Sequence, residues 1–223
     1  MLASNVFLLD GGPGDRWLID TGHRLERATL LAGLRGAGLA PSELAGVLLT
    51  HRHSDHAGNA AYLRARFDVR IFAHARDAAV LEGRESKPRL RPRSGDLLAW
   101  GFARIEDLTD TRVIVDHALQ GGESVAGLEV HHAPGHTEGS VLYRHEGTRS
   151  LLSGDTLLAA VPPLTLEQRM CLPHPDYAVD LAQALGSLRA FHRAGHAYDN
   201  LLAGHGRPIL GDARARAETL ISG

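Results

Sequence analysis

The positions of hydrophobic and polar residues predict short strands that alternate with helices along the whole chain. Two apolar runs, at residues 6–9 and 16–20, flank the turn-forming stretch Gly11-Gly12-Pro13-Gly14 and predict a β-hairpin. Further strands are expected where short apolar or alternating runs recur, at residues 47–50, 69–73, 128–130, 141–144, 151–152 and 201–203. The chain therefore has enough strand-forming segments for at least one sheet.

Helices are expected where apolar residues recur every three or four positions. One such stripe precedes Gly36 and consists of Leu25, Ala28, Leu31 and Leu34; another consists of Leu181, Leu185, Leu188 and Phe191. Residues 59–66, 76–81 and 213–221 also have helical patterns, whereas residues 82–112 have a weak pattern and are expected to form a connecting loop region. Because strands and helices interleave without a linker or repeat, we expect one domain over residues 1–223. Its class is α/β or mixed α+β, with helices covering sheets.

Composition and charge exclude several classes of protein. The 223 residues are 43% hydrophobic and 22% charged, as in ordinary globular proteins. The net charge of −2 provides no global positive field for nucleic acid or anionic lipid. The apolar run at 157–164 is interrupted by Pro162 and Pro163 and is too short for a membrane span. The start of the chain lacks the basic region of a secretory signal, and the single Cys171 cannot form an internal disulfide. We therefore expect a cytoplasmic protein.

Histidine is the one unusual feature of the composition, with 14 copies. A dense group, His51-Arg52-His53-Ser54-Asp55-His56, directly follows the predicted strand at 47–50. Residues two apart in an extended segment point the same way, so His51 and His53 can bind one metal ion. As the chain turns toward a helix, Asp55 and His56 point elsewhere, which favours a second ion beside the first. Random composition would produce this spacing in only about four in a thousand chains of this length.

Three further residues repeat one local arrangement, an apolar strand followed by small residues and then a possible metal ligand. They are His136, Asp155 and His205, and a glycine directly precedes each of them. The carboxyl ends of neighbouring strands meet along one edge of a sheet, so we expect these side chains to gather with the 51–56 group. The glycines allow the backbone to turn sharply near an ion. The sequence therefore predicts a dinuclear metal centre.

In these residues, and in Asp20-Thr21-Gly22 near its start, the sequence resembles the metallo-β-lactamase superfamily. The segments 50–58, 134–140, 153–156 and 204–206 most resemble its glyoxalase II-like hydrolases. The resemblance implies an αβ/βα sandwich, in which two mixed sheets pack face to face with helices outside. The roles that it implies are His51, His53 and His136 for the first ion, Asp55, His56 and His205 for the second, Asp155 for both, and Asp20 as a support of the metal-binding loop. From its position alone, Asp20 is a strand-end carboxylate typical of a turn or cap.

These ligands predict a hydrolase that cleaves a small-molecule ester, thioester or lactone. Imidazole and carboxylate groups suit two Zn²⁺ per chain, and they also accept Fe or Mn. Two cations would lower the pKa of a bridging water from 15.7 toward roughly 7, and the resulting hydroxide would attack the carbonyl. We expect Asp55 to orient this hydroxide and to take its proton. Unlike glyoxalase II itself, the sequence has little chain beyond His205, so a glutathione thioester is not the expected substrate.

Other functions predict different observations. A persulfide dioxygenase of the same superfamily would hold one iron in the first site, whereas an intact set of Asp55, His56 and His205 favours hydrolysis. A phosphodiesterase or a β-lactamase of the superfamily is a further alternative, and the net charge disfavours nucleic acid as a substrate. A non-enzymatic metal-binding protein would seal its ion with protein ligands, whereas catalysis needs an open position. The sequence leaves the oligomeric state open.

Nine other histidines lack the arrangement of strand followed by small residues, and we expect them in surface or core roles. Two of them lie near the predicted centre in the sequence. His23 comes just after the Asp20 turn, and His174 belongs to the proline-rich segment 162–175. Together with Arg169, Met170 and Tyr177, His174 could overhang the site and contact substrate.

Overall fold

The computed structural model describes residues 4–91, 93–109, 111–161 and 167–222, and its strands form two five-stranded sheets. The first sheet has the order β1-β2-β3-β4-β5, with strands β1 (Phe7–Asp10), β2 (Arg16–Ile19), β3 (Gly46–Leu48), β4 (Ile71–His74) and β5 (His117–Leu119). The second sheet has the order β10-β9-β8-β7-β6, with strands β6 (Ser124–Val125), β7 (Leu128–His132), β8 (Val141–His145), β9 (Ser150–Gly154) and β10 (Asn200–Ala203).

Both sheets are mixed. In the first, β1 and β2 form the predicted antiparallel hairpin, and β2 to β5 pair in parallel. In the second, β9 and β10 are parallel and the other pairs are antiparallel. Parallel neighbours end at the same edge of a sheet, so the loops after β2, β3, β9 and β10 can approach one another.

The two sheets pack face to face around an apolar core. Successive side chains of a strand point to opposite faces, so Trp17 and Ile19 point toward the second sheet while Leu18 between them points toward the helices. The second sheet contributes Val130, Val141 and other residues to the same core. Strands buried on both faces are short apolar runs, which is why the sequence pattern located most of them. The more exposed strands β5 and β6 lack such runs and were not predicted.

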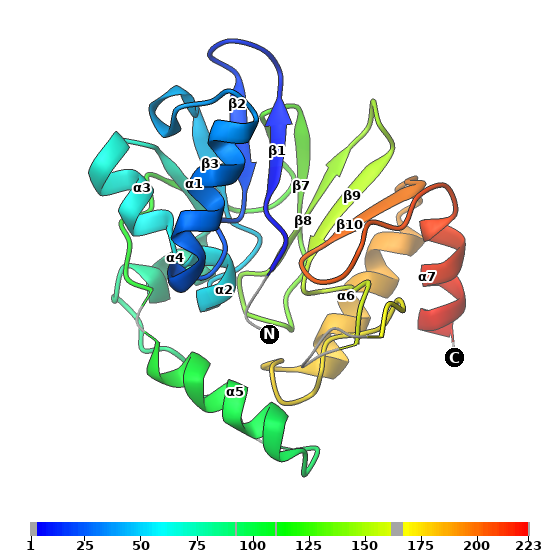
Figure 1. The fold of residues 1–223 in the computed structure, drawn as a ribbon. Helices are drawn as coiled ribbons and strands as arrows, with labels where there is room; N and C mark the ends of the chain where they lie inside the picture. The colour runs from blue at the N-terminus through cyan, green and yellow to red at the C-terminus, as the bar shows by residue number, and fades with distance from the viewer. Residues whose placement is uncertain (1–3, 92, 110, 162–166, 223) are drawn as a thin grey trace.

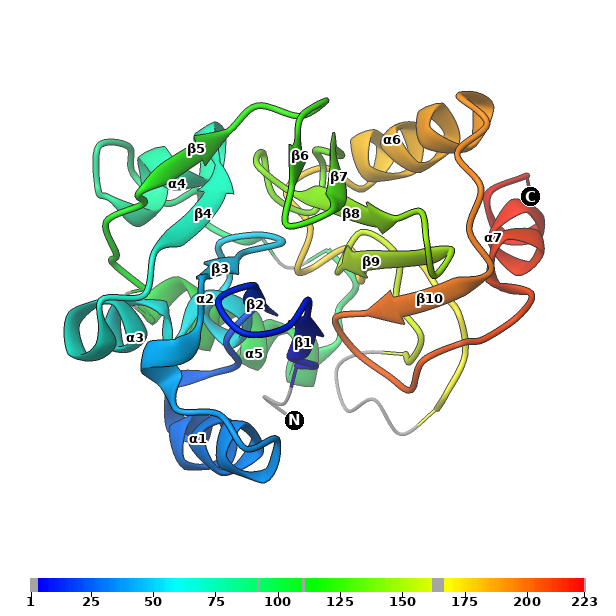
Figure 2. The ribbon, with the colours of Figure 1, turned by 90° about the horizontal axis from the view of Figure 1, so that it is seen from above.

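Helices cover the outer faces of both sheets. On the first sheet these are α1 (Arg27–Gly36), α3 (Ala60–Phe67) and α4 (Ala75–Leu81); on the second they are α6 (Leu181–Arg193) and α7 (Ala213–Ser222). Figures 1 and 2 show this order of layers, helix, sheet, sheet and helix. It is the four-layer αβ/βα sandwich that the resemblance implies. In the described ranges, no helix has both the length and the apolar character needed to cross a membrane.

The structure corrects two expectations about helices. Residues 82–112 contain a twelve-residue helix, α5 (Leu97–Leu108), where a connecting loop was expected. Figure 1 shows α5 apart from the two sheets, below the short helix α2 (Ser54–Ala57). The second correction concerns Leu25, which was placed in the apolar stripe of α1. It lies in a 3₁₀ turn, Arg24–Glu26, and is 75% exposed.

Candidate metal centre

The structure brings all seven predicted ligands together at one edge of the sandwich. Each lies just beyond the carboxyl end of a strand, and the strands come from both sheets. The group at 51–56 follows β3, whereas the ligands contributed by the second sheet are His136 after β7, Asp155 after β9 and His205 after β10. The centre therefore lies where the two sheets meet.

Three imidazole nitrogens converge on one point. Nε2 of His136 lies 3.2 Å from Nε2 of His51 and 2.9 Å from Nδ1 of His53. All three rings are buried. The other nitrogen of His51 contacts the Thr50 hydroxyl at 3.0 Å, which directs its Nε2 toward the other two rings.

A second group forms around Asp55, His56 and His205. Nε2 of His205 lies 3.2 Å from Oδ2 of Asp55, and Nε2 of His56 lies 3.9 Å from the same oxygen. The Asp55 side chain is 23% exposed, so this group faces solvent more than the buried three-histidine group does. A solvent-accessible carboxylate at the centre leaves an approach for a small molecule.

Asp155 lies between the two groups. Its Oδ1 is 3.3 Å from Nε2 of His56, and its Oδ2 is 3.3 Å from Nε2 of His205. The same Oδ2 is 3.8 Å from Nε2 of His136 in the first group. One carboxylate thus faces ligands of both groups, as a bridging role requires.

The residues present fit a pair of divalent ions. Nε2 of His56 and Oδ1 of Asp155 are buried 3.3 Å apart, and within the described residues neither has a partner in good hydrogen-bond geometry. Buried polar atoms are normally satisfied, so such atoms pointing into one space indicate a partner outside the protein. Five imidazoles and two carboxylates are suitable ligands for zinc or iron.

Burial keeps the three-histidine group neutral. It lowers the pKa of His51 and His53 well below the ordinary value and lowers that of His136 to about 4. At neutral pH these rings therefore have lone pairs available for a metal ion, with no proton to displace.

Carboxylates have the opposite effect on the second group. Burial opposes a charge on His56 and His205, but Asp155 and its acidic neighbours outweigh that effect. The pKa of His56 is raised well above its ordinary value and that of His205 to about 10. A metal ion bound here would replace these protons as the partner of the carboxylates.

Asp20 lies behind the second group, as the resemblance implies. Its carboxylate accepts hydrogen bonds from the backbone N–H and the hydroxyl of Thr50, both at 2.8 Å. It also contacts Nδ1 of His56 at 2.8 Å, which leaves Nε2 of that ring directed at the centre. The backbone of Asp20 has φ 61°, a left-handed conformation that aspartate tolerates better than most residues.

Several buried residues around the centre were not indicated by the sequence pattern. Glu106 of α5 accepts a hydrogen bond from the backbone N–H of Ser54 at 2.9 Å and pairs with Lys87. Asp77 of α4 contacts the loops on both sides of the three-histidine group. Each is a single acidic residue in a helix, and no local spacing distinguishes it from a surface residue.

His23 and His174, which lie near the predicted centre in the sequence, form hydrogen bonds with the backbone of their own segments. His23 is buried, and its Nδ1 accepts a hydrogen bond from the backbone N–H of Leu25 at the 3₁₀ turn. His174 accepts one from the backbone N–H of Asp176, and its ring centroid lies 5.2 Å from that of Tyr177. Residues 162–166 of the proline-rich segment lie outside the described residues.

A further cluster of metal-binding residue types is explained by ion pairing. Glu129, His131 and His196 offer three close ligand atoms on β7 and the segment before β10. Both oxygens of Glu129 pair with the Arg144 guanidinium, at 2.9 and 2.6 Å. That charge opposes a cation at the same place.

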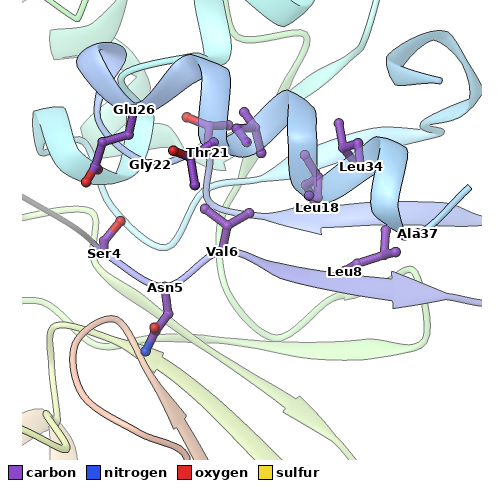
Figure 3. Close-up of a pocket in the computed structure, with 13 residues that line it drawn as sticks. Ser4, Asn5, Val6, Leu8, Leu18, Thr21, Gly22, Glu26, Leu34 and Ala37 are labelled. Atoms are coloured by element: carbon purple, nitrogen blue, oxygen red, sulfur yellow. The ribbon is translucent and has the colours of Figure 1, made fainter. Parts of the chain in front are cut away.

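A cavity of about 380 Å³ lies between β1 and α1. Figure 3 shows its mainly apolar lining, which includes Val6, Leu18 and Leu34. None of the seven predicted ligands is among the residues that line it.

Comparisons with known proteins show the family and the fold. The family model for the metallo-beta-lactamase superfamily matches residues 1–197. The probable metallo-hydrolase YybB of Bacillus subtilis is 31% identical over 182 residues, which are 81% of this chain and 71% of the relative. A hydroxyacylglutathione hydrolase of Anaeromyxobacter dehalogenans is 34% identical over 155 residues, 70% of this chain and 46% of the relative.

Two solved structures have the same fold. A metallo-beta-lactamase family protein of Thermus thermophilus is 31% identical, with a TM-score of 0.65 over 98% of this chain and 73% of that protein. TTHA1623 in a di-iron-bound form is 26% identical, with a TM-score of 0.64 over 94% of this chain and 90% of that protein. The family match spans most of the chain and the sandwich is shared, so this chain belongs to the metallo-β-lactamase superfamily.

Proposed function

We propose that this chain is a dinuclear metal-dependent hydrolase that cleaves a small-molecule ester, thioester or lactone. The observation that carries the proposal is the position of Asp155, whose two oxygens face His56 on one side and His205 and His136 on the other. A carboxylate in this position suits two neighbouring ions better than one. In this proposal His51, His53 and His136 hold the first ion, and Asp55, His56 and His205 hold the second.

Two divalent ions bound there would supply hydroxide near neutral pH and would polarise the substrate carbonyl. Zinc suits this donor set, and iron is the alternative that the di-iron-bound relative supports. The rings of the three-histidine group are neutral and can bind an ion directly. The rings of the second group must first lose a proton. We therefore expect the first position to fill at lower pH than the second.

Two residues of this chain would act on the substrate and the water. Asp55 is partly exposed and within 3.2 Å of His205, so its carboxylate can orient the attacking water and accept its proton. The Tyr177 hydroxyl is buried without a hydrogen-bond partner within the described residues. Burial raises the pKa of this hydroxyl, and the nearby carboxylates Asp96, Asp176 and Asp55 add to the effect, so it remains a donor. Because Asp55 belongs to the candidate centre, we propose that this hydroxyl donates a hydrogen bond to the substrate oxygen that becomes negative.

The proposed substrate class follows from the relatives. A hydroxyacylglutathione hydrolase acts on a thioester, and esters and lactones undergo the same attack on a carbonyl carbon. The chain spans less than half of that relative's length, so we propose the bond type and not glutathione itself.

The proposal is tested with the purified full chain. Metal content is measured first, and turnover is then measured on thioesters, lactones, β-lactams, phosphodiesters and glutathione persulfide. We expect two ions per chain and hydrolysis of a thioester, ester or lactone that a chelator abolishes and added metal restores. One iron per chain with oxygen consumption on the persulfide would overturn the proposal. So would two bound ions with cleavage of the phosphodiester alone.

A further inference from the structure

Arg52 has an unusual environment for a charged side chain. It lies between His51 and His53 in the sequence, yet its side chain is only 2% exposed. The guanidinium Nη1 contacts Oδ1 of Asp77 at 2.5 Å and Oε2 of Glu138 at 2.7 Å. A buried charge needs such partners, because removing one of them leaves the other uncompensated in a medium of low dielectric constant.

Asp77 connects the two loops that hold the three-histidine group. Its carboxylate accepts hydrogen bonds from the Arg52 backbone N–H at 2.8 Å, the Thr137 hydroxyl at 2.7 Å and the Gly139 backbone N–H at 3.0 Å, besides pairing with the Arg52 guanidinium. Arg52 lies beside His51 and His53, and Thr137 follows His136. One side chain, 1% exposed and anchored on α4, therefore links both segments from behind.

Gly139 shows how closely the second loop approaches this carboxylate. A Cβ atom at this position would lie 2.5 Å from the Asp77 backbone nitrogen and 2.6 Å from its carboxyl carbon. Since real side chains do not pack at such distances, the loop can reach Asp77 only with glycine here. The loop at Gly139 therefore packs directly against Asp77 with no space for a side chain.

We propose that Asp77 is a positioning residue that sets the spacing of His51, His53 and His136, and through it the affinity for the ion that these histidines hold. The inference rests on the proposed metal-dependent function. Ligand atoms must be held within about 0.5 Å of their bound geometry, and loss of a residue that supports the ligands typically weakens metal binding about 10- to 100-fold.

The effect should be confined to one of the two ions. Within the described residues, the hydrogen bonds of Asp77 go to the loops of the three-histidine group, whereas Asp20 contacts His56 of the second group directly and also Thr50, whose hydroxyl contacts His51. A residue with a merely structural role would lower the stability of the fold without changing the ratio of the two metal affinities. The ratio therefore distinguishes positioning from general stabilisation.

The test uses the full chain, freed of metal and titrated with Zn²⁺ against a competing chelator. The wild-type chain should bind two ions. Asp77→Asn should bind one of them about 10- to 100-fold more weakly and the other as before. Glu129→Gln is the matched control, because it breaks the Arg144 ion pair away from the centre and should leave both affinities unchanged.

A second variant covers the case in which Asp77→Asn does not fold by circular dichroism. Thr137→Val removes one hydrogen bond to Asp77 and should weaken the same ion, whereas Thr137→Ser keeps the hydroxyl and should restore binding. Unchanged affinities in the folded Asp77→Asn chain, or an equal loss of both ions, would overturn the positioning role. If Asp77→Asn does not fold, unchanged affinities of Thr137→Val for both ions would overturn the positioning role. A wild-type chain that binds no ion would instead overturn the proposed function.

Discussion

Asp155 is the residue on which the two halves of the candidate centre depend. Its carboxylate lies within 4 Å of ligand nitrogens in both groups, those of His56 and His205 in one and that of His136 in the other. Asp155→Ala should therefore lose at least one ion and reduce turnover by roughly 100-fold or more. Metal analysis and steady-state kinetics on the same preparation test this. Two ions and wild-type turnover in the variant would show that Asp155 does not bridge.

Tyr177 permits a test that separates substrate contact from metal binding. Tyr177→Phe removes the unpartnered hydroxyl and keeps the ring beside His174. If this hydroxyl donates to the developing negative oxygen, kcat should fall about 10²- to 10³-fold while the metal content stays the same. A change in KM alone would show that the hydroxyl contributes to substrate binding and not to stabilisation of the developing charge.

His74 should make stability depend on pH. It is buried, and burial lowers its pKa, with the nearby His132 adding to the effect. Because the folded pKa lies below the unfolded value of 6.5, this contribution is complete above pH 6.5 and is lost as pH falls below it.

Measurement of the free energy of unfolding of the metal-free chain between pH 7.5 and 5.5 tests this dependence. We expect the loss for wild type to exceed that for His74→Gln, by at most about 1.4 kcal/mol per pH unit. His145→Gln, at the last residue of β8, is the control for removal of a histidine. Parallel pH profiles for wild type and His74→Gln would contradict the assignment.

At this scale, the sequence indicated the candidate ligands, and the resemblance indicated Asp20, but neither indicated Asp77. The seven ligands have local signals, namely the dense spacing at 51–56 and the glycine before each of His136, Asp155 and His205. Asp77 has none, because its partners Arg52 and Thr137 are 25 and 60 residues away in the chain. Such contacts depend on how α4 packs, which no short pattern encodes.

At the scale of elements, the sequence predicted strands and amphipathic helices where apolar residues recur with a single period. α6 was found because Leu188 and Phe191 share its buried face. α5 was not found because it has apolar residues on all sides, including the exposed Leu97 and Leu108 and the buried Ala99 and Ala103. Apolar residues on the exposed face obscure the 3.6-residue pattern of the buried one, and the prolines before α5 suggested a loop instead.

The loop between β7 and β8 depends on a close contact with the start of α6. Gly135 has φ 136°, and a Cβ atom there would clash with the backbone of Ala184. Its carbonyl also accepts a hydrogen bond from the backbone N–H of Asp180, the residue that caps α6. Gly135→Ala should therefore destabilise the fold by about 2–3 kcal/mol and displace His136.

Urea unfolding and zinc titration of this variant test both consequences. Gly101→Ala is the matched control, because Gly101 lies within α5 with open space around it. It should stabilise its helix by about 0.5–1 kcal/mol and leave metal affinity unchanged. Equal stability of Gly135→Ala and wild type would show that the loop moves freely from α6.

On the scale of the whole molecule, the candidate centre joins two halves of the sandwich. The 51–56 group follows the first sheet, and His136, Asp155 and His205 follow the second. The sequence pattern indicated strands and helices but not that they form two sheets, because pairings such as β9 with β10 join residues some 50 positions apart. The family resemblance supplied the two-sheet arrangement, since periodicity contains no information on distant partners.

A centre built from both sheets should couple metal binding to the stability of the fold. Ions that bind only the folded chain stabilise it by about 4 kcal/mol at 1,000 times Kd, which for a chain of this size corresponds to roughly 10 °C in Tm. Chelation should therefore lower Tm by that order, and added Zn²⁺ should restore it. The Tm of the Asp155→Ala variant should change less on chelation, because this variant binds fewer ions. An unchanged Tm after proven removal of metal would mean that the two halves hold together without it, and that the ligands are fixed by the fold alone.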